Sequence, residues 1–263
     1  MNSFHNPDLV SIGLPTYNRV GLLRRAIDAL LAQTYKNFEL IISDNYSSDD
    51  TQKLCERYAA GDKRIRYIRQ KENIGMIANS RFVLQEARGE YFMWACDDDW
   101  WGPRFIEVLK NGLDQRPDYG IAMSSFERVY ADGGKADQLI FSGPDDLTYL
   151  TQEENFFKIV LPGRPFHQIL LGLVRTDLLR KIIIENPYPQ CQRHDRIVVG
   201  EFALFTRIYT VPEILWRKTI HKVSSIVRNK DTHGKRRSFT SKNYFIGLAG
   251  RLFCRRSSRS IAK

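Results

Sequence analysis

The chain contains 263 residues, of which 43% are hydrophobic, enough to bury the core of a globular protein as one large domain or a domain with a subdomain. Its net charge of +10 resides at the C-terminal end. Residues 217–263 contain 14 Lys and Arg against one acid, whereas residues 1–216 contain 26 basic and 29 acidic residues. Because the globular part is slightly acidic and carries no recognised nucleic-acid-binding module, a nucleic-acid partner is not expected.

Cysteine usage and hydropathy predict a cytoplasmic protein. The four cysteines have no CxxC spacing, and the N-terminus lacks the basic region and apolar core of a signal peptide. No apolar stretch approaches the roughly 18 to 20 residues that a membrane-spanning helix requires. We therefore expect a reducing compartment and a chain that does not cross a membrane.

The first 118 residues alternate between two periodicities. Short runs rich in branched and aromatic residues predict strands at 9–14, 38–43, 64–69 and 91–95. Helical periodicity predicts helices at 21–34, after a capping box at 47–50, at 75–87 and at 103–115. This alternation predicts a mostly parallel sheet with helices on both faces.

The alternation weakens after residue 119. A strand-like stretch beginning there and a "DGG" turn at Asp132–Gly134 predict antiparallel pairing. A helix near 152–160, a strand at 170–175, a helix capped by Thr176 and a longer helix within 195–209 follow. We therefore expect residues 1–118 and 119–222 to be two halves of one domain, followed by a basic tail at 223–263.

Ligands bind at the carboxyl ends of the strands in such sheets, which selects the loops "PTYNR", "DNYSSD" and "CDDDWW". The adjacent carboxylates of Asp97, Asp98 and Asp99 repel one another, and directly after a buried strand they favour a divalent cation. Mg²⁺ or Mn²⁺ bound in this way is completed by substrate phosphates. A solvated acidic turn or a helix start is the alternative.

The other two loops offer groups for a nucleoside. Asp44 and Asn45 directly follow a buried strand and supply an acceptor and an amide for a base edge or ribose hydroxyls. Tyr17 supplies an aromatic face for a base, and Thr16 and Asn18 supply polar groups. A capped helix start and an ordinary turn are the alternatives for these two loops.

The motifs "LPTYNR", "AQTYKNFELIISDNYSSDDT", "NIGMIANSR" and "GEYFMWACDDDWW", in this order, closely resemble the nucleotide-sugar glycosyltransferases of family 2. The resemblance extends over residues 8–115. It implies the GT-A fold, an α/β architecture with a Rossmann-like, mostly parallel sheet flanked by helices and a small antiparallel sheet in the acceptor-binding half. Residues 1–118 would then be the nucleotide-sugar-binding half.

The resemblance also implies roles for individual residues. Asp97 would face the ribose, Asp98 would hold the metal that bridges the two phosphates, and Asp99 would either support the ligands or be an alternative ligand. His221 matches a histidine found near the donor phosphates or metal in this family. The remaining donor-binding residues would be Pro15, Thr16, Tyr17, Asn18, Asp44, Asn45 and Asn73, the last forming a turn with Gly75 before a helix that could point its amides at the phosphates.

Two positions depart from the family pattern. Many members have Asp-x-Asp-Asp, and Cys96 stands where the first of those acids would be. Many also have Asp-Asp-Gly where this chain has Asp44, Asn45 and Tyr46. The division of labour among the three aspartates and the contacts with the base are therefore open.

Deprotonation of an acceptor hydroxyl requires a carboxylate in the second half. The segment "QRHDRIVVGEF" resembles a later family segment in which an acid begins a helix, so Asp195 is the expected base, with Glu201 in reserve. An acid stabilising the helix dipole is the alternative for Asp195. His167 and Arg175 are candidate acceptor contacts.

Tryptophans and the tail suggest further partners. Trp100 and Trp101 could stack on acceptor sugar rings, or belong to the core. The tail combines basic residues with an apolar face and could lie on an anionic membrane surface; a solvated disordered tail is the alternative. The expected location is cytoplasmic, peripheral at the inner face of the cell membrane.

The expected function is metal-dependent transfer of a sugar from a UDP-sugar to a hydroxyl of a glycan or lipid-linked acceptor, with inversion. One alternative is a nucleotidyltransferase of related topology, although "LPTYNRVG" lacks the glycine-rich loop such enzymes use for a triphosphate. The other is a non-catalytic glycan- or membrane-binding protein that keeps the fold.

Overall fold

The computed structural model describes residues 6–142, 146–160, 166–184 and 194–221, without the side chains of residues 160, 166, 167 and 194–197. The basic tail at 223–263 lies outside the described residues. Its predicted membrane contact therefore stays a prediction. Among the helices that the structure describes, none is long and apolar enough to cross a membrane.

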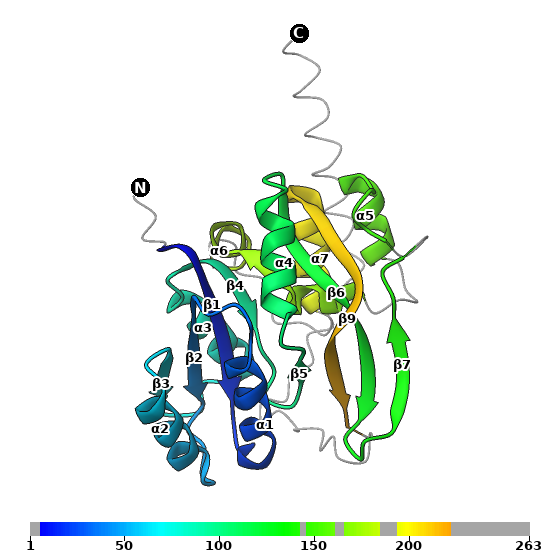
Figure 1. The fold of residues 1–263 in the computed structure, drawn as a ribbon. Helices are drawn as coiled ribbons and strands as arrows, with labels where there is room; N and C mark the ends of the chain where they lie inside the picture. The colour runs from blue at the N-terminus through cyan, green and yellow to red at the C-terminus, as the bar shows by residue number, and fades with distance from the viewer. Residues whose placement is uncertain (1–5, 143–145, 161–165, 185–193, 222–263) are drawn as a thin grey trace, which may run out of the picture.

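Strands and helices alternate in the first half, as the sequence predicts (Figure 1). Its elements are β1 (Asn6–Thr16), α1 (Val20–Leu31), β2 (Phe38–Asp44), α2 (Thr51–Gly61), β3 (Ile65–Arg69), α3 (Met76–Gln85), β4 (Gly89–Trp94), β5 (Trp100–Trp101) and α4 (Phe105–Asp114). The short strand β5 is the one element here that the sequence pattern does not predict.

The second half is less regular. Its elements are β6 (Tyr119–Tyr130), β7 (Lys135–Leu139), α5 (Gln152–Val160), the 3₁₀ helix η2 (Phe166–Leu171), β8 (Leu173–Arg175), α6 (Thr176–Ile183), α7 (His194–Phe205) and β9 (Arg207–Ile220). The turn at 132–134 joins β6 to β7 in the predicted antiparallel pair.

The described strands form one nine-stranded sheet in the order β3-β2-β1-β4-β8-β6-β9-β5, with β7 beside β6. Neighbours from β3 to β4 are parallel, and β6 is parallel to β9. The antiparallel pairs involve β8, β5 and β7. The predicted mostly parallel α/β sheet is confirmed, and its antiparallel strands belong to that same sheet.

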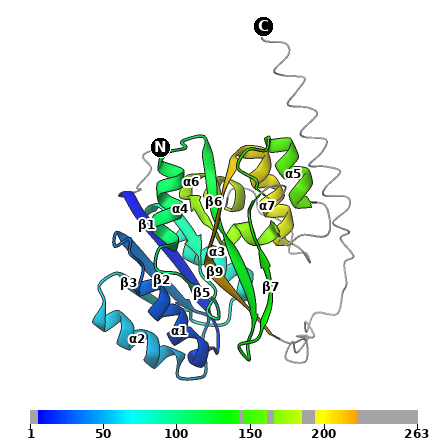
Figure 2. The same cartoon turned by 45° about the vertical axis from the view of Figure 1, so that its right-hand side comes forward.

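Helices cover both faces of the parallel part (Figures 1 and 2). α1 and α2 contact each other, whereas α3 packs on β1 and β2 and also contacts α6. Because β1 is buried on both faces, its middle residues Val10, Ile12 and Leu14 are fully inaccessible. Gly13 allows close packing here, since a Cβ at this position would meet the side chains of Phe92 and Val83.

The strand register brings three loops to one edge of the sheet. Thr16 at the end of β1 lies opposite Asp44 at the end of β2. Gly13 lies opposite Trp94 at the end of β4, and its carbonyl accepts a hydrogen bond from the Ala95 amide at 2.8 Å. The residues after β1, β2 and β4 therefore meet at the carboxyl edge, where the topology expects a ligand.

Three local predictions were wrong. The capping box at 47–50 does not begin a helix, because α2 starts at Thr51 without a side-chain cap. Thr176 does not cap α6, since its hydroxyl donates to the Gly89 carbonyl at 2.7 Å and ties α6 to β4. The strand predicted at 170–175 is shortened to β8, because Gly172 passes so close to the Ala122 carbonyl that only glycine fits.

Candidate functional site

The first and third loops are joined by a hydrogen bond between Thr16 and Asp97. The Thr16 hydroxyl donates to Asp97 Oδ2 at 2.7 Å. Burial raises the pKa of the Asp97 carboxyl to about 6, the hydrogen bond from Thr16 opposes this rise, and the charge of Asp98 adds to it. The carboxylate therefore titrates close to neutrality.

Asp98 contacts residues at the end of β9 and just after it. Its Oδ2 lies 2.8 Å from His221 Nε2, just after β9. The Asp98 carbonyl accepts a hydrogen bond from the hydroxyl of Thr219, which is on β9 itself. β9 thus fixes both the backbone and the side chain of Asp98, and the predicted proximity of His221 to the acidic loop is present.

Asp99 is the most buried of the three acids, with 1% of its surface exposed. Its Oδ1 accepts a hydrogen bond from the Thr219 amide at 2.8 Å, while Oδ2 has no hydrogen-bond partner among the described residues. Burial raises the pKa of this carboxyl to about 7; the Lys218 cation lowers it, Asp98 raises it, and the Thr219 amide and the Trp216 indole lower it. These groups compensate the charge of an ionised Asp99 only in part, and a bound cation would stabilise it further.

One set of closely spaced metal-ligand atoms occurs in the described part of the chain. It consists of Cys96, Asp98 and Asp99, whose potential ligand atoms all lie within 4.8 Å of one another. The orphaned buried oxygen of Asp99 fits a divalent cation, since buried acceptors are normally satisfied. Carboxylate oxygens are the ligands that Mg²⁺ and Mn²⁺ prefer.

Asp44, which is fully buried at the end of β2, stabilises the second loop through hydrogen bonds. Its Oδ1 accepts the Ser47 amide at 2.9 Å, and its Oδ2 accepts the Tyr67 hydroxyl at 2.9 Å. Arg69 also approaches Oδ2, with Nε at 3.6 Å. Asp44 thus stabilises the loop internally, while its position places it at the edge of the sheet where a base would bind.

Asn45 links the second loop to the turn before α3. Its Nδ2 donates to Asn73 Oδ1 at 2.8 Å, and its Oδ1 accepts the Ile74 amide at 2.9 Å. Asn73 Oδ1 also accepts the Gly75 amide at 2.9 Å, and Gly75 has a positive φ of 85° that favours glycine. The predicted residues Asn45 and Asn73 therefore lie in direct contact and fix this wall of the site.

The first and second loops each contain an exposed tyrosine. Tyr17 follows Pro15 and Thr16 at the end of β1 and is 45% exposed, and Tyr46 is 48% exposed. Asn18 joins their two loops, because its Oδ1 accepts the Ser48 amide at 2.8 Å. The Arg69 guanidinium lies 4.4 Å from the centroid of the Tyr46 ring. Both rings are available at the carboxyl edge.

Sequence reasoning missed the groups that support the site from a distance. Thr219 contacts both Asp98 and Asp99 from β9, and Tyr67 and Arg69 support Asp44 from β3. Nothing in their local sequence distinguishes them. Only the pairing of strands could have identified them.

The candidates for the acceptor side fall mostly outside the described side chains. Asp195 lies in the first turn of α7, as predicted, and His167 lies in η2, but their side chains are outside the described set. Glu201 lies further along α7 and is buried. The role of Asp195 as a base stays a prediction.

The two tryptophans after the acidic triplet occupy different environments. Trp101 is 1% exposed and pairs with the buried Trp216 on β9, so of the two alternatives for this residue the structure supports the core. Trp100 is partly exposed and pairs with Arg217, whose guanidinium lies 4.8 Å from its ring centroid. Trp100 alone remains a candidate for contact with a sugar.

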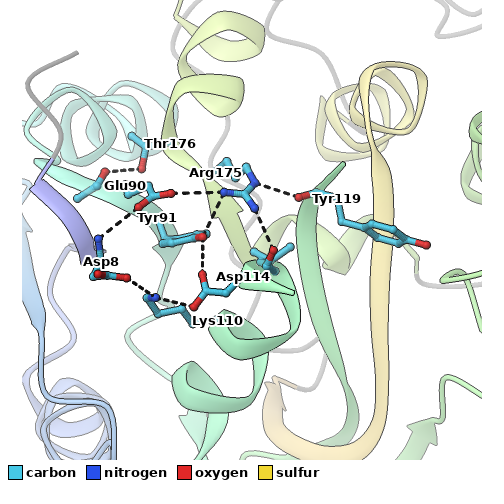
Figure 3. Close-up of polar contacts among 10 residues, drawn as sticks. Asp8, Glu90, Tyr91, Lys110, Asp114, Tyr119, Arg175 and Thr176 are labelled. Atoms are coloured by element: carbon cyan, nitrogen blue, oxygen red, sulfur yellow. Dashed lines mark hydrogen bonds and ion pairs between the residues drawn. The ribbon is translucent and has the colours of Figure 1, made fainter. Parts of the chain in front are cut away.

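Arg175 lies among polar side chains and carbonyls that include Glu90, Tyr91 and Tyr119 (Figure 3), at the end of the sheet opposite the acidic loop. It pairs with Tyr91 near the amino end of β4, because β8 is antiparallel to β4. Its guanidinium donates to the carbonyls of Tyr119 and Leu113 at 3.1 and 3.0 Å and to the Tyr91 hydroxyl at 3.1 Å. The prediction that Arg175 contacts the acceptor was wrong, and its role is to join β4, β6 and α4.

Comparison with known proteins is consistent with this geometry. Residues 11–171 match the family model described as Glycosyl transferase family 2. An uncharacterized glycosyltransferase of Rickettsia typhi is 30% identical over 214 residues, which are 81% of this chain and 64% of that protein. A protein of Escherichia coli K12 that carries the name colanic acid biosynthesis glycosyl transferase WcaA is 40% identical over 104 residues, 40% of this chain and 37% of that protein. The chain thus spans less than two thirds of the length of either relative.

Solved structures share the fold at low sequence identity. Residues 1–349 of TarS from S. aureus superpose with a TM-score of 0.65 and 18% identity, covering 80% of this chain and 60% of that one. The same TarS fragment has been solved with UDP-GlcNAc, with a TM-score of 0.63 and 17% identity over 81% of this chain and 59% of that one. The mannosyltransferase PcManGT from Pyrobaculum calidifontis, solved with GDP-Man and Mn²⁺, has a TM-score of 0.56 and 17% identity, covering 80% and 56%.

Proposed function

The chain belongs to glycosyl transferase family 2, and from this premise we propose that it transfers a sugar from a UDP-sugar to a hydroxyl of a glycan or lipid-linked acceptor. The transfer is metal-dependent and inverts the anomeric carbon. The observation that carries the proposal is the acidic edge itself, where Asp97, Asp98 and Asp99 meet Thr16 from β1 and His221 from beyond β9. Such a cluster suits a nucleoside diphosphate bound through a divalent cation.

The donor occupies the carboxyl edge of the parallel strands. Asp97 accepts hydrogen bonds from the ribose, and Tyr17 stacks on the base beside Asp44. Asn45 and Asn73 hold the turn before α3, whose first amides face the phosphates. UDP is the favoured nucleotide because the structural neighbour TarS has been solved with UDP and UDP-GlcNAc. GDP should be tested beside it, because the neighbour PcManGT has been solved with GDP-Man.

Asp98 and Asp99 would hold Mn²⁺ or Mg²⁺, with His221 beside Asp98. Such an ion neutralises the charge that develops on the leaving diphosphate. The protein's own residues orient the donor so that one face of the sugar stays open to the acceptor. Direct attack on that face inverts the anomeric carbon.

Asp195 removes the proton from the acceptor hydroxyl as the new glycosidic bond forms. Its position in the first turn of α7, a helix of the second half of the chain that contacts β9, supports this role. Trp100 stacks on the acceptor sugar. The name of the Escherichia coli relative favours an acceptor of bacterial polysaccharide synthesis.

Product analysis tests the reaction class. We expect incubation with UDP-sugars and Mn²⁺ to release UDP and a free or transferred sugar whose anomeric configuration, followed by NMR, is opposite to that of the donor. Release of pyrophosphate would instead identify a nucleotidyltransferase, and no turnover of any nucleotide sugar would favour a non-catalytic glycan-binding protein. The Asp195→Asn variant should bind UDP normally and lose transfer.

A further inference from the structure

We propose that the thiolate of Cys96 binds the metal ion together with Asp98 and Asp99, so that this site, besides Mn²⁺, binds thiophilic divalent ions such as Zn²⁺, Co²⁺ and Cd²⁺ with added affinity. The inference rests on the metal site of the proposed function and specifies its ligands. Cys96 occupies the position at which many family members have an acid. A cysteine at this position offers a soft sulfur atom where an acid would offer a hard oxygen.

The turn after β4 brings the three side chains together. The Asp99 amide donates to the Cys96 carbonyl at 3.4 Å, which closes the chain from Cys96 to Asp99 on itself. Potential ligand atoms of Cys96, Asp98 and Asp99 all lie within 4.8 Å of one another. With bonds of about 2.3 Å from zinc to sulfur and about 2.0 to 2.2 Å from zinc to carboxylate oxygen, ligand atoms lie up to about 4.5 Å apart, which is close to this spacing.

An independent observation indicates that a ligand belongs there. Asp99 is almost completely inaccessible, and its Oδ2 has no hydrogen-bond partner among the described residues, although Oδ1 is satisfied by the Thr219 amide. A buried carboxylate oxygen without a partner is costly. A cation between Asp99 and its two neighbours satisfies this oxygen.

The surroundings of Cys96 differ from those of a cysteine that merely fills space. Cys55 is such a residue, because it is fully buried within the hydrophobic core on α2. Cys96 is not part of that core, and its sulfur lies within 4.8 Å of potential ligand atoms of both Asp98 and Asp99. This position next to two carboxylates suits a metal ligand better than an apolar filler.

Soft sulfur ligands change the order of metal preference. Thiolates select Zn²⁺ and other thiophilic ions, whereas sites built from carboxylates and water suit Mg²⁺ and Mn²⁺. When the metal–sulfur bond forms, the thiol proton is released to solvent. Binding of a thiophilic ion to this site should therefore release one more proton than binding to a site in which serine replaces Cys96.

Cobalt titration of the full chain without nucleotide tests the proposal. We expect Co²⁺ to produce the near-ultraviolet sulfur-to-cobalt charge-transfer band, and Cys96→Ser to abolish it. Cys96→Ser should also weaken Cd²⁺ binding, measured by calorimetry, at least about tenfold, since even loss of a group that only supports a ligand costs about 10- to 100-fold. Mn²⁺ binding should change far less.

Four further variants complete the experiment. Cys55→Ala removes the cysteine of the core and should leave the band unchanged, as should Cys191→Ser and Cys254→Ser. Cys96→Asp restores an acid at this position and should lose the band and the preference for Cd²⁺ while it retains Mn²⁺ binding, which also shows that the variant folds. Co²⁺ binding without the band, or a band that survives Cys96→Ser, would overturn the inference and leave the proposed function intact. If no divalent ion bound, with or without UDP, both the inference and the metal-dependent function would fail.

Discussion

At the scale of single residues, the hydroxyl of Thr16 lowers the pKa of Asp97, the residue expected to bind the ribose. Its hydrogen bond to Asp97 favours the charged carboxylate and opposes the rise of the pKa to about 6 that burial causes. In Thr16→Val this pKa should rise further. Because ribose binding needs the carboxylate, affinity for UDP should then fall at a higher pH than in the native protein.

Calorimetric titration of UDP at several values between about pH 5 and 8 measures this shift. Thr34→Val is a suitable control, since the Thr34 hydroxyl contacts Pro103 and Glu107 and not an acid of the site. An acidic limb that stays at the same pH in Thr16→Val would contradict the assignment of Asp97 to the donor.

Asp99 makes stability depend on pH in the absence of metal. Its pKa of about 7 lies above the unfolded value of about 3.9, so between these values the folded protein binds a proton that the unfolded chain has lost. The contribution of this proton to the free energy of unfolding is fully present below about pH 4 and is lost as pH rises to 7. Between these pH values the free energy of unfolding therefore falls, through Asp99, by at most about 1.4 kcal/mol per pH unit.

Urea unfolding at several pH values in the presence of a chelator measures the effect. Asp99→Asn is the matched control, because the amide oxygen can still accept the Thr219 hydrogen bond but cannot ionise. As pH rises, the native protein should therefore lose free energy of unfolding through this group, and Asp99→Asn should become more stable relative to it. A constant difference across this range would show that Asp99 is not protonated in the fold.

At the scale of elements, β8 lies between β4 and β6 at the edge opposite the site, and its Arg175 joins the two halves through the contacts that Figure 3 shows. Arg175→Met leaves the carbonyls of Leu113 and Tyr119 without this donor and should lower the free energy of unfolding by about 1 to 3 kcal/mol. Affinity for UDP should be unchanged. Arg207→Met, which removes an exposed ion pair with Asp118, should cost less than about 1 kcal/mol. A large loss of UDP binding in Arg175→Met would contradict the structural role.

The contact between the loop after β2 and the turn before α3 depends on Asn45. Asn45→Ala removes the hydrogen bonds to Asn73 and Ile74 and should free this turn. We expect faster amide hydrogen exchange in 70–76 and weaker binding of UDP. Asn111→Ala on the exposed surface of α4 serves as the control. Unchanged exchange in 70–76 would show that Asn45 does not hold the turn.

The elements also show why sequence patterns predicted one half better than the other. β1 to β4 and their helices form consecutive strand-helix units, so local periodicity is sufficient to predict them and the three loops at their ends. β8 is inserted between β4 and β6, and β5 pairs with β9 far along the chain. Such pairings leave little local signal, which is why Thr219, Arg175 and Trp101 could be assigned only from the structure.

At the scale of the whole molecule, strands from both halves of the sheet contribute to a single acidic edge. The parallel strands deliver Thr16, Asp44 and the acids after β4 to this edge, and β9 returns from the second half to fix Asp98 and Asp99 through Thr219. Both halves of the sheet are therefore needed to complete the site. This arrangement explains how family motifs confined largely to the first half depend on residues outside it.

Binding of UDP with and without Mn²⁺, measured by calorimetry on the native protein and on Asp98→Asn, tests the central claim most directly. The account predicts that UDP binds native protein much more tightly when Mn²⁺ is present and that Asp98→Asn, which keeps the size of the side chain, loses this dependence. The account would be contradicted if Mn²⁺ did not change the affinity of the native protein for UDP. It would also be contradicted if Mn²⁺ raised the affinity of Asp98→Asn for UDP as much as that of the native protein.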